Sequence, residues 1–206
     1  MTAGDASLKV LRPAHRPSRR SSIIETAVQI FSRQGPRATV QSIADACGLT
    51  SAAIYYHFPD KDALFSAAVE LVADRIESAT TAAERVAGAP LSMRDAAEVV
   101  WRWAADHRDE ARMLYSWAAS GPSPARAARQ RFIDDYRERI LARIPGRPRD
   151  RPEEDLADQL GVRAYLTLAM ATSEAWVTDE PIGGTDDQLR IVDALSEFGR
   201  RLTGAP

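Results

Sequence analysis

Apolar residues near the N-terminus recur at the three- and four-residue spacing that is typical of an amphipathic α-helix. The first such run consists of Ile24, Ala27, Val28 and Phe31. A serine before this run, at position 18, 21 or 22, is expected to cap the helix, because a serine hydroxyl accepts a hydrogen bond from a free backbone N–H of the first turn. The Gly35-Pro36 pair is expected to end it.

The stretch 39–58 predicts two short helices joined by a tight turn. Ile43, Ala44 and Cys47 keep helical spacing, and Gly48 follows where the first of the two helices must stop. The hydroxyl of Thr50 can then cap a second helix over residues 51–57. Two helices joined by so short a turn, with a glycine in it, are typical of the helix-turn-helix motif.

A long helix is expected over residues 60–87, where an inward stripe is marked by Leu64, Ala68, Leu71, Val72, Arg75 and Ile76. At 1.5 Å per residue it would be about 40 Å long, enough to connect an N-terminal head to a second domain. Clusters of proline and glycine separate further helices, which are expected over residues 91–119 (with a potential break near His107), 125–144, 152–178 and 186–203. No stretch shows the two-residue alternation of a strand, so the predicted fold class is all-α.

The second short helix carries side chains that suit a protein–DNA contact. The side chains at its N-terminal end are small and those at its other end are aromatic. This is expected for a helix whose tip enters the major groove while phenol hydroxyls reach the phosphates beside it. The candidate DNA-contacting residues are Thr39, Gln41, Thr50, Ser51, Ala52, Ala53, Tyr55, Tyr56, His57 and Lys61. Among them, His57 is either a phosphate contact or a packed side chain.

Charge is distributed unevenly along the chain. Residues 1–62 carry eight lysines and arginines against five acids, a net charge of +3, so that the rest of the chain carries −5 of the total of −2. A basic head on an acidic body is expected of a DNA-binding protein. Residues 1–17 are expected to form a flexible basic arm. The basic residues in and after it either follow DNA phosphates, enter the minor groove or belong to a solvated tail; they are Lys9, Arg12, Arg16, Arg19 and Arg20. We therefore expect this arm, a helix-turn-helix domain at 18–62 and a C-terminal helical domain at 63–206.

Spaced positions from residue 24 to residue 64 form one recognisable pattern. They are Ile24, Ala27, Phe31, Gly35, Thr39, Ile43, Ala44, Gly48, Leu49, Thr50, the run Ile54-Tyr55-Tyr56-His57-Phe58, Lys61 and Leu64. This pattern resembles the N-terminal signature of the tetracycline-repressor (TetR) family, with Cys47 standing where the family usually has alanine. The resemblance implies an all-helical homodimer in which three N-terminal helices bind an operator in double-stranded DNA. It also implies a C-terminal domain for ligand binding and dimerisation, in which a small-molecule effector of unknown identity weakens operator binding.

Large side chains in the C-terminal half are candidates for an effector pocket between helices. They are Trp101, Met113, Trp117, Phe132, Tyr136, Tyr165 and Met170. Met113 and Trp117 are four residues apart, as are Phe132 and Tyr136, so each pair would share a helix face. The alternative is that each of these residues belongs to the core, the more usual place for aromatic side chains at helical spacing.

The last two expected helices are candidates for a dimer interface. Residues 162–177 are apolar or small on almost every side, so one face needs cover beyond what the chain's own domain supplies. Two such helices from each subunit would form a four-helix bundle. The candidate interface residues are Ala164, Leu168, Ala175, Leu189, Val192, Leu195 and Phe198.

Other chemistries have little support in the sequence. His15, His57, His107 and Cys47 lack the spacing of a metal site, and neither a phosphate-binding loop nor a nucleophile elbow is present. We therefore expect no catalytic residue, no metal, no cofactor and no enzymatic activity. No apolar run approaches the roughly 20 residues that span a bilayer, so we expect a cytoplasmic protein that contacts no membrane.

These features together predict a ligand-responsive, DNA-binding transcriptional regulator that acts as a repressor and is released from its operator by a small molecule. The alternative is an all-helical small-molecule-binding protein with a vestigial DNA-binding head. The basic head and the set Tyr55, Tyr56 and Lys61 favour the regulator, because a head without a DNA ligand has no need of either.

Overall fold

The structure is a computed structural model that describes residues 18–143, 152–178 and 188–203. Every regular element in these ranges is helical, which confirms the all-α prediction. The predicted arm at 1–17 lies outside the described residues. In chain order the elements are α1 (Arg19–Gln34), the 3-10 turn η1 (Gly35–Arg37), α2 (Val40–Cys47), α3 (Ser51–His57), α4 (Lys61–Ala87), α5 (Met93–Asp106), α6 (Arg108–Arg112), the π-helical turn η2 (Met113–Trp117), α7 (Ala118–Ser120), α8 (Ser123–Arg143), α9 (Pro152–Val177) and α10 (Gln188–Thr203).

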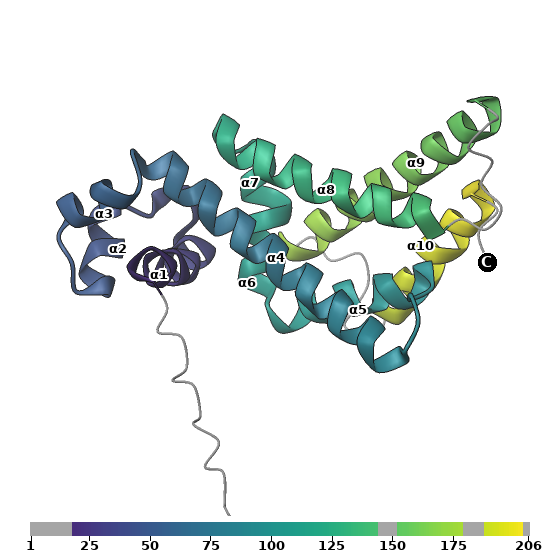
Figure 1. Cartoon of the computed structure of the whole chain (residues 1–206), viewed down its shortest axis with the longest axis horizontal. Helices are drawn as coiled ribbons and strands as arrows, with labels where there is room; N and C mark the ends of the chain where they lie inside the picture. The colour runs from purple at the N-terminus through teal and green to yellow at the C-terminus, as the bar shows by residue number, and fades with distance from the viewer. Residues whose placement is uncertain (1–17, 144–151, 179–187, 204–206) are drawn as a thin grey trace, which may run out of the picture.

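Helices α1, α2 and α3 form a small head at one end of an elongated molecule, and α5 to α10 form a larger body (Figure 1). The 27-residue helix α4 runs from the head into the body without a break and packs against α1, α5 and α8. Of its predicted inward stripe, Leu64, Ala68, Val72 and Ile76 are buried, whereas Leu71 and Arg75 are half-buried. The expected domain boundary at residue 62 therefore falls in the first turn of a helix that belongs to both parts.

Local sequence signals set the ends of the helices in the head. Ser18 is the N-cap of α1, and its hydroxyl accepts a hydrogen bond from a backbone N–H of the first turn at 3.1 Å. Thr39 caps α2 in the same way, and Gly48, with a φ of 65°, ends it in the left-handed conformation that glycine adopts without strain. Thr50 then caps α3, which spans the predicted residues. The turn between α2 and α3 is thus fixed by glycine on one side and a threonine cap on the other.

The helix expected over residues 91–119 is divided into four pieces. The backbone of His107 leaves the helical region, with φ −127° and ψ 46°, and separates α5 from α6. The turn η2 then has π-helical hydrogen bonding, from residue i to residue i+5, which widens the helix by one residue. Met113 is buried, whereas the half-buried Trp117 faces the head. The expectation that these two residues share a face assumed α-helical geometry, and the π-helical turn removes that basis.

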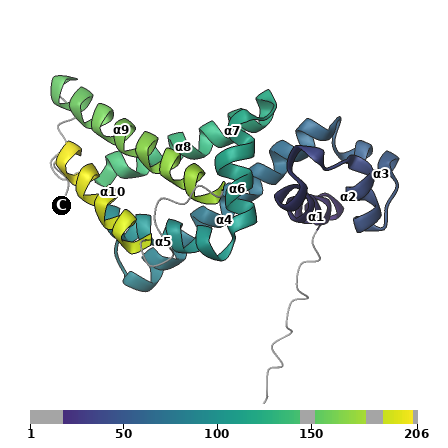
Figure 2. The ribbon, with the colours of Figure 1, turned by 180° about the vertical axis from the view of Figure 1, so that it is seen from behind.

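The outer part of the body consists of α8, α9 and α10. Helix α8 lies between α4 and α9, and α10 packs against both α9 and α5 (Figure 2). Gly199 allows the close approach of α10, because a Cβ atom there would lie 2.6 Å from the sulfur of Met93 and 2.8 Å from a ring carbon of Tyr165. No helix within the described ranges is long and apolar enough to cross a membrane.

Candidate functional site

All ten candidate DNA-contacting residues lie on the head or at its junction with α4. Thr39 and Thr50 are N-caps, Gln41 lies on α2, six lie within α3 and Lys61 begins α4. Tyr56, on α3, is the most exposed large side chain among the ten, at 86%. None of the ten is buried. Ile54 and Phe58 are 1% and 2% exposed, so that α3 is anchored on one side and open on the other.

A pair of hydrogen bonds ties α2 to the first turn of α3. The Ser51 hydroxyl donates to the side-chain oxygen of Gln41 at 2.7 Å, while the amide nitrogen of Gln41 donates to Asp45 at 2.7 Å. Because the Gln41 amide is held from both sides, its orientation is fixed before any ligand arrives. The N-terminal end of α3 is therefore preorganised, with Ala52 exposed at its tip.

Lys61 has a structural contact as well as a position that suits DNA. Its ammonium group donates a hydrogen bond of 2.8 Å to the carbonyl oxygen of Pro36 in η1. An ammonium group has three N–H donors, so two remain for other acceptors. His57 is half-buried and its ring meets Tyr56 edge-on, with centroids 5.1 Å apart, which leaves both of its expected roles open.

The head and the body are joined by contacts on both sides of α4. The Arg75 guanidinium forms an ion pair with Glu25 on α1 and another, at 2.6 Å, with Glu110 on α6. Burial opposes the charge of Arg75, but the hydrogen bond to Glu110 and the negative charges of Glu110 and Glu25 outweigh burial and raise its pKa. On another side, the ring of Trp117 lies against Gly35. A change in the position of α6 or η2 would therefore alter these direct contacts with α1 and η1.

The seven candidate effector-binding residues are not brought together. Trp101, Met113 and Tyr165 are buried in the core, where Trp101 packs against Trp176 with ring centroids 5.7 Å apart. Burial raises the pKa of Tyr165 above its ordinary value of 10, so this phenol is neutral. Trp117 lies at the head–body junction. Phe132 and Tyr136 line a groove between α4 and α8, and Met170 lines another between α8 and α9.

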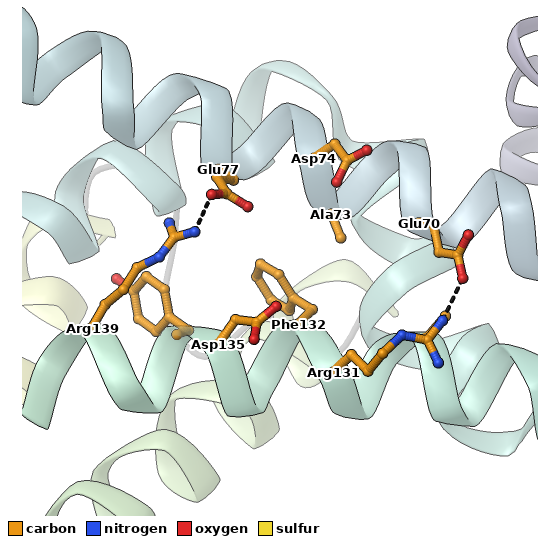
Figure 3. Close-up of a pocket in the computed structure, with 10 residues that line it drawn as sticks. Glu70, Ala73, Asp74, Glu77, Arg131, Phe132, Asp135 and Arg139 are labelled. Carbon is orange, nitrogen blue, oxygen red and sulfur yellow. Dashed lines mark hydrogen bonds and ion pairs between the residues drawn. The ribbon is translucent and has the colours of Figure 1, made fainter. Parts of the chain in front are cut away.

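The groove between α4 and α8 is small and acidic (Figure 3). Ion pairs of Glu70 with Arg131 and of Glu77 with Arg139 bridge it at two places, leaving Asp74 between them. Burial and the negative charges of Glu77 and Glu70 raise the pKa of Asp74. The cavity volume is about 120 Å³, well below the roughly 300 Å³ at which ligand pockets usually begin.

The groove between α8 and α9, which we call the α8–α9 groove, is larger and basic. Its cavity volume is about 350 Å³, and it is lined by Arg129, Gln130, Ile133, Asp134, Arg137, Arg163, Leu166, Thr167, Met170, Ala171 and Glu174. Sequence analysis identified only Met170. The arginines were missed because Arg129 and Arg163 are far apart in the sequence, and an isolated arginine has the pattern of a solvated helix face.

The candidate dimer residues divide into two groups. Val192 and Leu195 are 1% and 5% exposed, so they are already covered within the chain. Leu168 and Phe198 remain exposed at 41% and 39%, and Ala164 lies on the same exposed side of α9 as Leu168. Ala175 is half-buried, and the side chain of Leu189 lies outside the described residues. Within α9, Leu156 and Leu160 add further exposed apolar surface.

Comparison with known proteins gives a consistent picture of the head. A family model described as bacterial regulatory proteins, tetR family, matches residues 23–68. Nucleoid occlusion factor SlmA of Marinobacter nauticus is 39% identical over 64 residues, which are 31% of this chain and 33% of that protein. The HTH-type transcriptional regulator AcrR of Shigella flexneri is 47% identical over 53 residues, a quarter of each chain. This chain thus spans a third or less of the length of these relatives.

The fold of most of the chain is also found in solved structures. The crystal structure of the multidrug binding protein EbrR, complexed with imidazole, has a TM-score of 0.67 to this chain, covering 93% of this chain and 97% of EbrR at 19% identity. At that identity the likeness concerns the fold alone.

Proposed function

Because its N-terminal domain belongs to the tetR family of bacterial regulatory proteins, we propose that this chain is a DNA-binding transcriptional regulator that represses from an operator in double-stranded DNA. The observation that carries the proposal is the arrangement of α3. The helix is capped by Thr50, anchored by Ile54 and fixed to α2 through Gln41, while its outer side carries Ala52, Tyr55 and Tyr56 in the open.

The proposed contacts follow from these positions. Ser51, Ala52 and Ala53 at the first turn of α3 enter the major groove and meet base edges, because small side chains let the helix approach closely. Tyr55 and Tyr56 donate hydroxyl hydrogen bonds to phosphates beside it, and the ammonium of Lys61 uses its remaining N–H groups in the same way. Contacts of the first kind select sequence, and those of the second kind supply affinity.

The regulator acts as a homodimer in this proposal. Leu160, Leu168 and Phe198 leave apolar surface on α9 and α10 exposed to water, and a second copy packed about a two-fold axis would cover it. A two-fold protein reads a palindromic operator, with recognition helices spaced by about 34–36 Å, one turn of DNA.

A small molecule bound in the body would release the protein from DNA. The support is the helix α4, which runs from head to body, together with the contacts that Arg75 and Trp117 make across the junction. If the effector prefers a body conformation in which the two heads are wrongly spaced, its binding shifts the population away from the DNA-bound form. We place this activity in the bacterial cytoplasm and assign the chain no enzymatic role.

The test is selection of binding sites from a pool of random duplex DNA by the purified full chain at near-physiological salt. Enrichment of a palindrome is the expected result. Ala53→Ser should then change the enriched sequence, whereas Tyr56→Ala should weaken binding to every sequence, and Arg102→Ala on the far side of α5 should do neither. Binding with no enriched sequence would contradict the proposal and favour a small-molecule-binding protein with a vestigial head.

A further inference from the structure

The α8–α9 groove has the charge and the apolar wall of a site for a particular chemical class. We propose that it is the effector site and that the effector is an amphiphile with a single anionic head group, a carboxylate or a phosphate ester. The assignment of an effector role depends on the proposed function, whereas binding of such a molecule in the groove can be tested without DNA.

The groove has two distinguishable ends. On α9, Arg163 and Glu174 are eleven residues apart, or about 16 Å along the helix axis. On α8, the guanidinium group of Arg129 interacts electrostatically with the carboxylate of Glu174. The two helices run in opposite directions (Figure 1), so Arg137, two turns beyond Arg129, lies toward the Arg163 end. One end therefore combines Arg129 with Glu174, and the other combines two positive charges.

The positive charges of the groove are not fully matched by its acids. Arg137 forms an ion pair with Asp134 at 3.1 Å and a longer one, at 3.4 Å, with Glu138 outside the groove, so that Arg163 is the arginine at this end without an acidic partner among the described residues. Arg163 makes no side-chain hydrogen bond or ion pair with any residue that the structure describes. With three arginines against Asp134 and Glu174, the groove lining carries a net charge of +1. One anionic group seated at the Arg137 and Arg163 end would balance it.

Arg129 gives a second indication of a missing partner. Its Nε atom is buried and has no hydrogen-bond partner, although a buried N–H of a charged group is costly to leave unsatisfied. Glu174 favours the charge of Arg129, but the two groups do not come within ion-pair distance. Burial lowers the pKa of Arg129, which shows that its surroundings supply less stabilisation than water does. A ligand that reaches this end with a polar atom would relieve the deficit.

The wall between the two ends is apolar. Leu166 is 6% exposed, and the half-buried Ile133 and Met170 lie beside it in the groove. Methionine adapts its shape to irregular ligands because its side chain is unbranched and flexible. A purely ionic ligand would leave this surface uncovered, so an anion with an apolar body matches the groove better than an inorganic anion does.

A physical route leads from this groove to the head. The last carbonyl groups of α9 accept hydrogen bonds from α6: Arg112 donates to Val177 at 2.8 Å and Arg108 donates to Trp176 at 2.9 Å. Helix α6 continues into η2, whose Trp117 lies against Gly35 in the head. A ligand that moves α9 relative to α8 therefore acts on the elements that touch the head.

Isothermal titration calorimetry on the full chain tests the site with four probes of equal chain length: decanoate, decyl phosphate, decylammonium and decanol. We expect decanoate, decyl phosphate or both to bind, with decylammonium and decanol at least about tenfold weaker, since a charge-assisted hydrogen bond is commonly worth a factor of ten or more. A preference between the two anions identifies the head group. No binding of either anion, or equal binding of decylammonium, overturns the proposal.

Two variants locate the site. Arg163→Gln and Arg137→Gln should each weaken binding of the anionic probe by about tenfold, because both arginines lie at the end that receives the head group. Arg131→Gln is the matched control, because Arg131 lies on the same helix but faces Glu70 across the other groove. Equal affinity of all three variants overturns the assignment, provided that circular dichroism shows each to be folded. Failure of the full chain to bind DNA would contradict the proposed regulator function. The calorimetric result would still decide whether the groove binds an anionic amphiphile.

Discussion

The indole ring of Trp117 occupies the space where Gly35 would carry a side chain. A Cβ atom built on Gly35 would lie 2.9 Å from both Cε2 and Cζ2 of that ring, closer than real Cβ atoms come to other atoms. Gly35 also has a φ of 58°, in the region that favours glycine. The body and the head thus meet at a position where only glycine fits, because both the neighbouring indole ring and the backbone conformation exclude a β-carbon.

Gly35→Ala should destabilise the protein more than the same change elsewhere. The backbone of Gly35, with φ 58° and ψ −140°, lies outside the left-handed helical region and in a conformation that a residue with a β-carbon rarely adopts, and the clash with Trp117 adds to this cost. Gly88→Ala is the control, because Gly88 has a φ of 68° and nothing within 4 Å of its virtual Cβ. Urea denaturation measures the loss of stability in each variant, and Gly35→Ala repeated in a Trp117→Ala background separates the backbone cost from the clash. Equal losses of stability would show that the Trp117 contact does not constrain the junction.

Gln41→Ala should weaken operator binding by about fivefold to tenfold with little loss of stability, because the first turn of α3 loses the hydrogen bond that orients it, worth about 1 kcal/mol. Gln130→Ala is the matched control: Gln130 makes the same kind of contact, to Asp134 at 3.2 Å, on the body helix α8. Fluorescence anisotropy with the selected operator measures both variants. If the two bind alike, the link between α2 and α3 has no part in recognition.

Phe198→Glu should convert a dimer to monomers, because it places a charge in the apolar surface that a second subunit would cover. Sedimentation velocity at micromolar concentration reports the change. Val86→Glu introduces the same side chain at a position that is 91% exposed near the end of α4, a helix outside the proposed interface, and should leave the dimer intact. A wild-type chain that sediments as a monomer would remove the premise.

Asp74→Asn should raise stability at neutral pH, by up to about 0.5 kcal/mol as is usual for surface positions. Burial, Glu77 and Glu70 raise the pKa of Asp74 above 3.8 in the folded state. A carboxyl with a raised folded pKa binds its proton more tightly when folded, so its charged form disfavours folding at neutral pH, and this penalty disappears as the pH falls through the folded pKa. The gain in the variant should therefore shrink on acidification, as thermal melts at pH 7 and pH 4 would show.

The head could be predicted closely because its signals are local. Thr39 and Thr50 as caps, Gly48 as a left-handed stop and the period of the apolar residues each act within a few positions of the chain. The π-helical turn at Met113–Trp117 lies beyond such reasoning. It is a local departure from i to i+4 bonding with no sequence signal of its own, held in place by the packing of Trp117 against a residue 82 positions earlier.

The effector site could not be predicted because core and pocket aromatics have the same sequence pattern. Trp101 and Tyr165 satisfy every criterion that Phe132 satisfies, yet the first two are buried in the core and the third lines a groove. The groove with the better ligand chemistry is marked by arginines from two helices, Arg129 and Arg163, and only their packing side by side distinguishes them from charges on a solvated surface.

Because α4 is continuous, a small tilt of this helix can be compared with the rise of one base pair of DNA. The helix has 27 residues and is therefore about 40 Å long. A tilt of about 5° at its body end moves its head end by about 3.5 Å, close to the 3.4 Å rise of one base pair. In the proposed regulator, a rotation of this size would be sufficient to shift each recognition helix by one step along the operator. Register on the DNA would then depend on the angle of a helix most of which lies far from any base.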